Sequence, residues 1–173
     1  REDDPPRERR RGRVAAALLA ADIPVFLPFG QGLAFDLIAV TPPRGDLVRI
    51  QVKSGRKRKG CVEFNTCSTD HGSGPQAYTG RADVIAVHLP DPSRLFIVPV
   101  DVCPTSKGNL RLEDPRNNQR RRVRFAAEYE FDAWVHALKA SCSLTQGDLR
   151  AIGHADRDHL RHAPPEGRPA VAG

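Results

Sequence analysis

The sequence predicts one domain of the mixed class, α+β or α/β, in which a helix precedes a sheet and another helix follows it. Three observations carry this prediction: an Ala- and Leu-rich stretch near the start, a series of short apolar segments, and an amphipathic segment over 131–140. A chain of 173 residues is long enough to bury a hydrophobic core. We expect the domain to span 1–140 and a polar, poorly ordered tail to span 141–173.

The expected elements follow one another closely along the chain. The first helix is expected over about 8–21 because Ala and Leu favour helix there. Short segments rich in Val, Ile, Leu and Phe predict strands over 23–28, 34–40, 47–54, 59–66, 82–89 and 94–100. The Gly, Ser and Pro of 68–76 indicate a flexible loop.

The last part of the domain is less regular. Two short apolar pieces, 109–112 and 123–127, flank a basic loop. The final helix, over 131–140, places four apolar side chains on one side, which predicts a face that packs on the core: Phe131, Trp134, Val135 and Leu138.

Charge favours a polyanionic partner. The net charge is +6 with a pI near 9.5, and only 5 of the 27 basic residues are Lys, so Arg supplies the other 22. An Arg fork donates two parallel hydrogen bonds to phosphate, which indicates nucleic acid. The alternative is codon bias, because Ala, Gly and Pro are abundant too.

Several classes of protein are disfavoured. The sequence has no apolar run of 18 residues and no signal-peptide pattern, so we expect a cytoplasmic protein without a membrane partner. Its four Cys residues form no close CxxC pair, which favours reduced thiols over a zinc ribbon or a disulfide scaffold.

The stretch 34–54 combines two apolar strands with three polar residues. Pro42, Pro43 and Gly45 favour a tight turn between the strands, and pairing Thr41 with Asp46 sets Asp36 opposite Gln51. Alternation then puts four polar residues on one face, Asp36, Arg49, Gln51 and Lys53. It puts six apolar residues on the other, Phe35, Leu37, Ala39, Val48, Ile50 and Val52.

This polar face has the composition of a metal site. The oxygens of Asp36 and Gln51, with the backbone carbonyl of Val52, suit Mg²⁺, which lowers the pKa of bound water. Lys53 could orient or deprotonate that water, or stabilise charge in the transition state. The alternative is a solvated hairpin face with a minor Asp36–Lys53 ion pair.

Asp36 followed by Gln51-Val52-Lys53 resembles the QxK form of the PD-(D/E)XK nuclease signature, in the group I intron homing endonuclease branch. The likeness covers about 12–131 and extends to VFLPFGQGLAFDLIAV, to QAYTGRADVIAVHLPDPSRLFIVPVDV and to LRLEDPRNNQRRRVRFAAEYEF. It implies a restriction-endonuclease-like core with a central mixed sheet flanked by helices, DNA as substrate, and self-association. It also implies Mg²⁺, with Mn²⁺ as a substitute, and no small-molecule cofactor.

The resemblance implies catalytic roles for Asp36, Gln51 and Lys53, with Asp36 as metal ligand and Gln51 in place of the usual second acid. Relatives commonly carry a Glu on the first helix, near positions occupied here by Arg10, Arg11 and Gly12. Three alternatives follow: Glu8 completes the metal site, Glu63 on a neighbouring strand does so, or the protein binds DNA with weak or absent cleavage.

Two basic segments, 53–60 and 117–124, lie next to or near this site. They are expected to bind DNA phosphates rather than to recognise bases. The candidate nucleic-acid-binding residues are Arg49, Arg56, Lys57, Arg58, Lys59, Arg120, Arg121 and Arg122. An RNA-processing factor is a third, weaker hypothesis beside the enzyme and the DNA-binding module.

Overall fold

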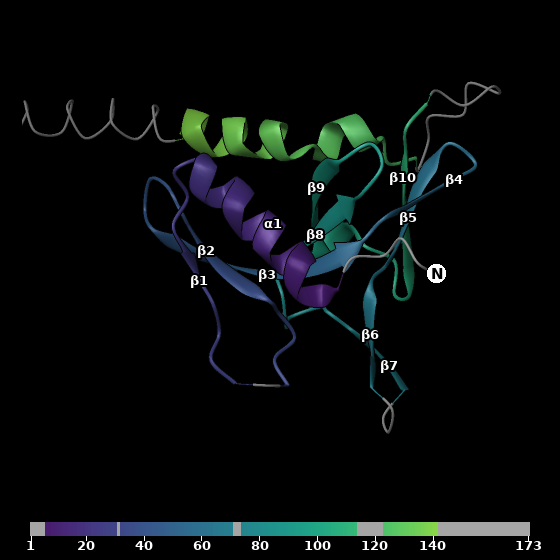
Figure 1. The fold of residues 1–173 in the computed structure, drawn as a ribbon, viewed down its shortest axis with the longest axis horizontal. Coiled ribbons are helices and arrows are strands. Elements are labelled where there is room, and N and C mark those ends of the chain that lie inside the picture. The colour runs from purple at the N-terminus through teal and green to yellow at the C-terminus, as the bar shows by residue number, and fades with distance from the viewer. Residues whose placement is uncertain (1–5, 31, 71–73, 114–122, 142–173) are drawn as a thin grey trace, which may run out of the picture.

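The computed structural model describes residues 6–30, 32–70, 74–113 and 123–141. Its centre is a five-stranded sheet in the order β1-β2-β3-β8-β9 (Figure 1). These strands are β1 (Val25–Phe26), β2 (Leu37–Thr41), β3 (Asp46–Ser54), β8 (Val84–Leu89) and β9 (Arg94–Pro99). Only β3 and β8 run parallel; the other pairs are antiparallel. The predicted mixed sheet is therefore confirmed.

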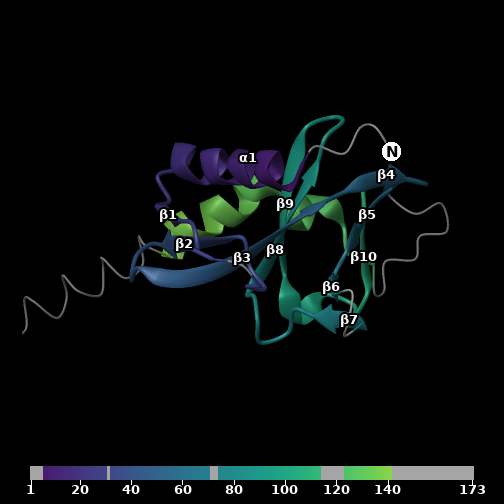
Figure 2. The ribbon, with the colours of Figure 1, turned by 60° about the horizontal axis from the view of Figure 1, so that its bottom comes forward.

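Two helices cover one face of this sheet. Helix α1 (Arg7–Ala20) confirms the first expected helix, and residues 131–141 form the second (Figure 2). Val14 and Leu18 of α1 pack with Leu37, Ile50 and other buried side chains of the sheet. The predicted apolar face of the second helix packs against this same cluster, through Phe131, Trp134, Val135 and Leu138.

A smaller sheet covers the opposite face. It has the order β10-β5-β4 and comprises β10 (Lys107–Arg111), β5 (Cys61–Asn65) and β4 (Arg56–Arg58). Val62, Phe64 and Leu110 of this sheet form a second core with Ile85 and Phe96 of the central sheet. Both faces of the central sheet are therefore buried, which explains why every residue of β8 is buried.

Short elements complete the described chain. A two-stranded hairpin, β6 (Cys67–Asp70) with β7 (Gly74–Ala77), lies where the sequence predicts a flexible loop. Two 3-10 helices, η1 (Val100–Val102) and η2 (Ala126–Tyr129), follow β9 and precede the second helix. The loop prediction was wrong because backbone hydrogen bonds can pair strands of polar and small residues without any apolar alternation.

The register of the β2–β3 hairpin is as predicted. Thr41 faces Asp46, Ile38 faces Arg49 and Leu37 faces Ile50. One residue was misplaced: Phe35 lies before β2 begins and packs against the second core, with Ile85 and Phe96, rather than with Leu37. Strand alternation does not extend into the irregular backbone ahead of β2.

The chain passes from the central sheet to the small sheet at Gly55. A Cβ at this position would lie 2.6 Å from Val62 Cγ1 and 2.9 Å from Val87 Cγ1, so a side chain would collide with both sheets. The Gly55 amide donates to the carbonyl of His88, 2.8 Å away. Glycine at this position therefore allows the two sheets to meet directly beyond Lys53.

Two further expectations concern membrane helices and cysteines, and both can be compared with the described residues. None of their helices is long and apolar enough to cross a membrane. Cys61, Cys67 and Cys103 are free thiols, as predicted, and Cys142 lies outside the described residues together with most of the expected tail.

Candidate active site

A cavity of about 780 Å³ opens between the start of α1, the loop ahead of β2 and the middle of β3. The candidate catalytic residues Asp36, Gln51 and Lys53 all line it. Val52 and Glu8, the other proposed metal ligands, line it too. The structure thus brings together every member of the predicted catalytic and metal-binding set.

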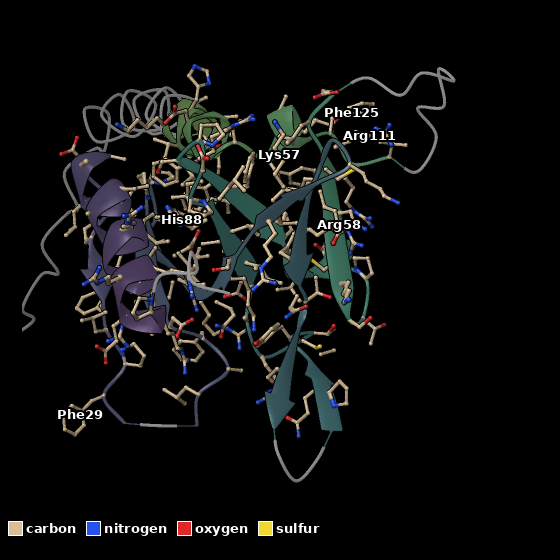
Figure 3. All side chains as sticks on the ribbon, turned by 45° about the vertical axis from the view of Figure 1, so that its right-hand side comes forward. Phe29, Lys57, Arg58, His88, Arg111 and Phe125 are labelled. Atoms are coloured by element: carbon tan, nitrogen blue, oxygen red, sulfur yellow. The ribbon has the colours of Figure 1, made fainter. Side chains whose placement is uncertain are left out.

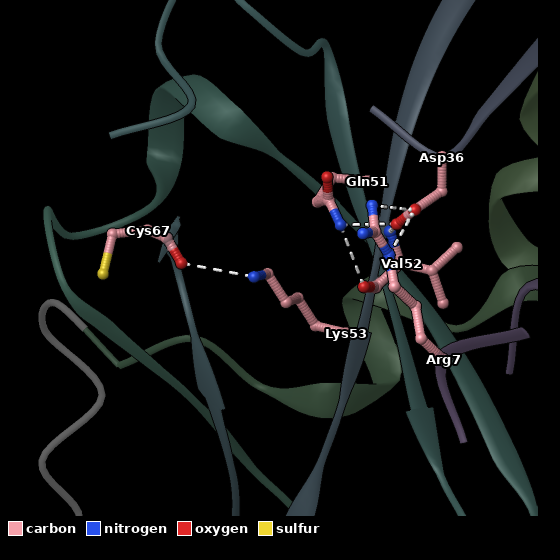
Figure 4. A network of polar contacts seen from close by, with 6 residues as sticks. All are labelled: Arg7, Asp36, Gln51, Val52, Lys53 and Cys67. Atoms are coloured by element: carbon pink, nitrogen blue, oxygen red, sulfur yellow. Dashed lines mark hydrogen bonds and ion pairs between the residues drawn. The ribbon is translucent and has the colours of Figure 1, made fainter. Parts of the chain in front are cut away.

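Asp36 is buried, with 1% of its surface exposed, and both of its carboxylate oxygens accept hydrogen bonds (Figure 4). Oδ2 accepts from the Val52 backbone amide at 2.9 Å and from Gln51 Nε2 at 2.5 Å. Oδ1 accepts from Arg7, at 2.9 Å from Nε and 2.6 Å from Nη2. A buried carboxylate needs such donors, because an unpaired charge in the interior is costly.

The partner of Asp36 corrects one expectation. The alternative interpretation of this face was a solvated hairpin with an Asp36–Lys53 ion pair, but Asp36 is buried and its ion pair is with Arg7. Lys53 Nζ instead donates to the Cys67 carbonyl at 3.2 Å.

Gln51 is also buried and connects the carboxylate to the backbone. Its Nε2 donates to Asp36 Oδ2 and, at 3.2 Å, to the carbonyl of Val52. The amide therefore presents its NH₂ group, not its oxygen, to the two acceptors that would bind a cation. To become a ligand, Gln51 must turn its amide over and offer Oε1.

Lys53 is held away from the carboxylate by the β6–β7 hairpin and its neighbour Tyr78. Its Nζ lies 4.9 Å from the centroid of the Tyr78 ring, in cation–π contact. Burial lowers the pKa of Lys53, and the charge of Asp36 opposes this effect. Burial and the nearby Asp36 charge raise the pKa of Tyr78 to about 12, so its phenol stays protonated near neutral pH. A depressed lysine pKa is typical of a group that handles protons.

Of the two carboxylates considered as a second metal ligand, Glu8 is the one in the cavity. It lies in the first turn of α1. Glu63 lies on β5, lines a different cavity and forms an ion pair with Arg58 at 3.7 Å. In the described part of the chain, no three His, Cys, Asp or Glu residues gather as a metal cluster, which leaves Asp36 as the buried carboxylate of the site.

A second cavity, of about 550 Å³, adjoins the first, because Arg10 and Lys53 line both. Its lining is strongly basic and includes Arg56, Lys57 and Arg58 of β4, together with Lys107. Figure 3 shows Lys57 and Arg58 at the β4 end of the small sheet. We call this second cavity the basic groove. Three of the predicted phosphate-binding residues lie in it, and Lys59 follows directly in the turn after β4.

Arg49 has a structural partner. Its guanidinium donates to both oxygens of Asp83, at 2.7 and 3.1 Å, and to the carbonyl of Gly80 at 3.0 Å. These bonds lower the pKa of Asp83 and raise that of Arg49. Arg49 therefore braces β3 against the start of β8, and its contact with DNA stays a prediction. Arg120, Arg121 and Arg122 lie outside the described residues.

The sequence reasoning missed Arg7, the residue that forms the ion pair with Asp36. It considered the first helix only as a source of a carboxylate, whereas positions 7–11 hold four Arg and one Glu. The available signal was this run of Arg beside a buried acid, because a buried carboxylate needs a cationic or hydrogen-bonding partner.

A fold with a mixed central sheet, an Asp ahead of its second strand and a Gln-x-Lys on its third strand defines a class of nuclease. The model of the PD-(D/E)XK endonuclease family matches residues 8–132, and the chain belongs to this family. Nucleases of this family generally use divalent metal ions.

Among solved structures, the chain is similar to that of a bacterial homing endonuclease, I-Ssp6803I, with a TM-score of 0.60 and 21% sequence identity. The similarity covers 79% of this chain and 93% of that one. It supports the nuclease fold across most of the chain. No curated protein matches the sequence.

Proposed function

We propose that the protein is a divalent-metal-dependent endonuclease that hydrolyses phosphodiester bonds in DNA. The observation that carries the proposal is the convergence of Asp36, Gln51, the Val52 carbonyl and Lys53 on one cavity. Basic side chains, including Arg10, Arg11 and Arg81, line the same cavity and favour a phosphate substrate.

The donor set fits a hard cation such as Mg²⁺ or Mn²⁺. Asp36 Oδ1, the Val52 carbonyl and the turned amide oxygen of Gln51 are oxygen ligands, and Glu8 can supply a second carboxylate from α1. The fit requires Arg7 to leave Asp36 Oδ1. A divalent ion held there supplies Lewis-acid stabilisation of phosphate charge and a more acidic bound water.

The remaining roles, which are activation of water and binding of phosphate, fall to side chains and backbone groups of the protein. Lys53, whose pKa is lowered by burial, orients or deprotonates the attacking water beside the scissile phosphate. Tyr78 and the Cys67 carbonyl hold its ammonium group in position. The basic groove continues from this point and binds the flanking phosphates.

Nicking of supercoiled plasmid in Mg²⁺ or Mn²⁺ tests the proposal, with Lys53→Ala as the decisive variant. We expect Lys53→Ala to lower the cleavage rate by about 10²-fold or more, because general acid–base groups contribute on this scale. Lys139→Ala, on the distant helix 131–141, is the matched control and should cleave like the wild type. Cleavage that persists in Lys53→Ala would reveal a contaminating nuclease.

One observation favours a second candidate function, a DNA-binding module without turnover. Arg7 already neutralises Asp36, and Gln51 brings no negative charge, so the free site attracts a cation weakly. Salt-sensitive DNA binding without nicking in either metal would support this alternative. Competition between DNA and RNA of the same sequence tests the nucleic acid preference, and light scattering tests the expected self-association.

A further inference from the structure

We propose that Arg7 is a phosphate-binding residue that is stored on Asp36 in the free protein and transferred to the DNA backbone when metal and DNA bind. The ligand of Arg7 is thus a phosphodiester oxygen. The transfer makes metal binding and DNA binding cooperative. This inference rests on the proposed function of the same site.

The two oxygens of Asp36 have different partners, and this difference supports the transfer. Oδ2 is fixed by Gln51 and by the Val52 amide within the sheet. Oδ1 accepts both of its bonds from Arg7 (Figure 4). Departure of Arg7 would therefore free one carboxylate oxygen for a metal ion while the Val52 amide still holds the carboxylate in place.

Arg7 is also the partner that can move. Its side chain is 64% exposed, against 1% for Asp36, and it occupies the first residue of α1, directly after the N-cap Pro6. Its guanidinium keeps its positive charge at any ordinary pH, so a metal ion cannot remove it by deprotonation. The metal must displace the intact cation.

Charge in the cavity explains why DNA must assist this displacement. Arg10, Arg11, Lys53 and Arg81 line the same cavity as Arg7. A divalent ion at Asp36 would add positive charge to the cavity. It would also separate the Arg7 guanidinium from its carboxylate, so that this charge faces the other cations without a counter-ion. Phosphate oxygens offset both effects, and an Arg fork binds phosphate through two parallel hydrogen bonds. By linkage, DNA should raise metal affinity as much as metal raises DNA affinity.

Calorimetric titration of Ca²⁺ into the full chain, with and without a saturating short DNA duplex, tests the transfer. Ca²⁺ is used because it seeks the same oxygen ligands, and the heat of Ca²⁺ binding to the duplex alone is subtracted. For the wild type, we expect the duplex to raise Ca²⁺ affinity about tenfold, within the usual range of such couplings.

Arg7→Gln is the decisive variant because glutamine keeps a hydrogen-bond donor and loses the charge. We expect it to bind Ca²⁺ about tenfold more tightly than the wild type in the absence of DNA, and to gain less than about threefold on adding the duplex. It should also lose DNA affinity with Ca²⁺ present and little without it. Arg9→Gln is the matched control, an exposed arginine of the same helical turn that does not line the cavity, and should behave as the wild type.

Two results would overturn the inference, and they differ in what they say of the proposed function. DNA-enhanced Ca²⁺ binding that is the same in the wild type and Arg7→Gln overturns the role of Arg7 alone. DNA binding with no Ca²⁺ binding in either protein overturns both the role of Arg7 and the metal-dependent function. Arg7→Lys, which keeps the charge but not the fork, should resemble the wild type in the absence of DNA and bind DNA more weakly in Ca²⁺.

Discussion

The cavity around Asp36 and the basic groove adjoin each other but differ in how their charged side chains are placed. Those at Asp36 are paired around a buried carboxylate, and those of the groove are mostly exposed. In the cavity, Arg7 and Gln51 each donate to the buried carboxylate of Asp36, at 2.5 to 2.9 Å. In the groove, Lys57 and its neighbours on β4 are exposed. Glu63 meets Arg58 only at 3.7 Å, and their side chains are 40% and 69% exposed. Exposed pairs of this kind contribute little to stability.

This difference implies a division of labour. In the cavity, the buried carboxylate of Asp36 is hydrogen-bonded on both oxygens, so changes there should affect folding and chemistry together. The groove presents a field of positive charge, so changes there should affect affinity and its salt dependence without affecting the fold.

The largest effect is expected from Asp36→Ala. Removing the carboxylate leaves the buried Val52 amide without an acceptor and leaves Gln51 Nε2 with the Val52 carbonyl alone. We expect a loss of about 3 kcal/mol in the free energy of unfolding. Asp36→Asn keeps an acceptor for Val52 and should cost less than half as much. Urea denaturation measures both, and wild-type stability in Asp36→Ala would contradict the idea of a rigid paired site.

Gly55→Ala should have the next largest effect because Gly55 joins the two regions. Its new methyl group would collide with Val62 and Val87, which predicts a loss of about 2 kcal/mol. Gly12→Ala is the matched control: it meets no atom within 4 Å on helix α1 and should raise stability slightly. The double variant Gly55→Ala, Val62→Ala should recover part of the loss; no recovery would mean that the collision is not the cause.

Removing two cations from the groove, with Lys57→Ala and Lys107→Ala together, should weaken DNA binding about tenfold at low salt. The slope of log affinity against log salt should fall by about two, since each lost phosphate contact removes about one unit. Fluorescence anisotropy over a salt series measures this, with Lys139→Ala as control. A change of more than about 0.5 kcal/mol in unfolding free energy would show that the groove also supports the fold.

The smallest effect is expected from Asp83→Asn, which removes the charge that faces Arg49. Because hydrogen bonds from Arg49 lower the pKa of Asp83 in the folded state, the stabilisation is present above the unfolded-state pKa and is lost as pH falls through the folded-state pKa. The melting temperatures of wild type and variant should thus differ slightly at pH 7 and converge in acid. Asp101→Asn is the control, and a difference that grows in acid would reverse the assigned sign.

The hairpin that carries the site could be predicted because several local signals agree. Pro42, Pro43 and Gly45 define the turn, and alternation from Leu37 to Val52 fixes the register, since a slip of one residue would expose the apolar set. That register places Asp36, Gln51 and Lys53 on one face, and the resemblance to PD-(D/E)XK nucleases then implies their roles. The six predicted strands each overlap an observed strand, because their Val-, Ile- and Phe-rich segments either alternate, as in β2 and β5, or are buried throughout, as in β8.

The features that were missed have both long-range and local causes. Arg7 meets Asp36 across 29 residues, and no local spacing sets where the start of α1 falls relative to β2. Phe35 was misassigned because strand alternation was extended past the end of the strand. The β6–β7 hairpin has the composition of a loop and is defined by its backbone pairing. Of the three, the Arg7–Asp36 contact is the one that depends on residues far apart in the chain.

The parallel pairing of β3 with β8 has a consequence for how such a protein can diversify. Parallel neighbours require a long crossover, usually a helix, yet here the crossover consists of β4, β5 and the β6–β7 hairpin. The chain thus leaves the sheet just after Lys53, forms β4 and β5 beside the basic groove and the β6–β7 hairpin, and returns to the adjacent strand. Insertions within this crossover could change the shape of the basic groove while β3, which carries Gln51 and Lys53, keeps its register with β2 and β8.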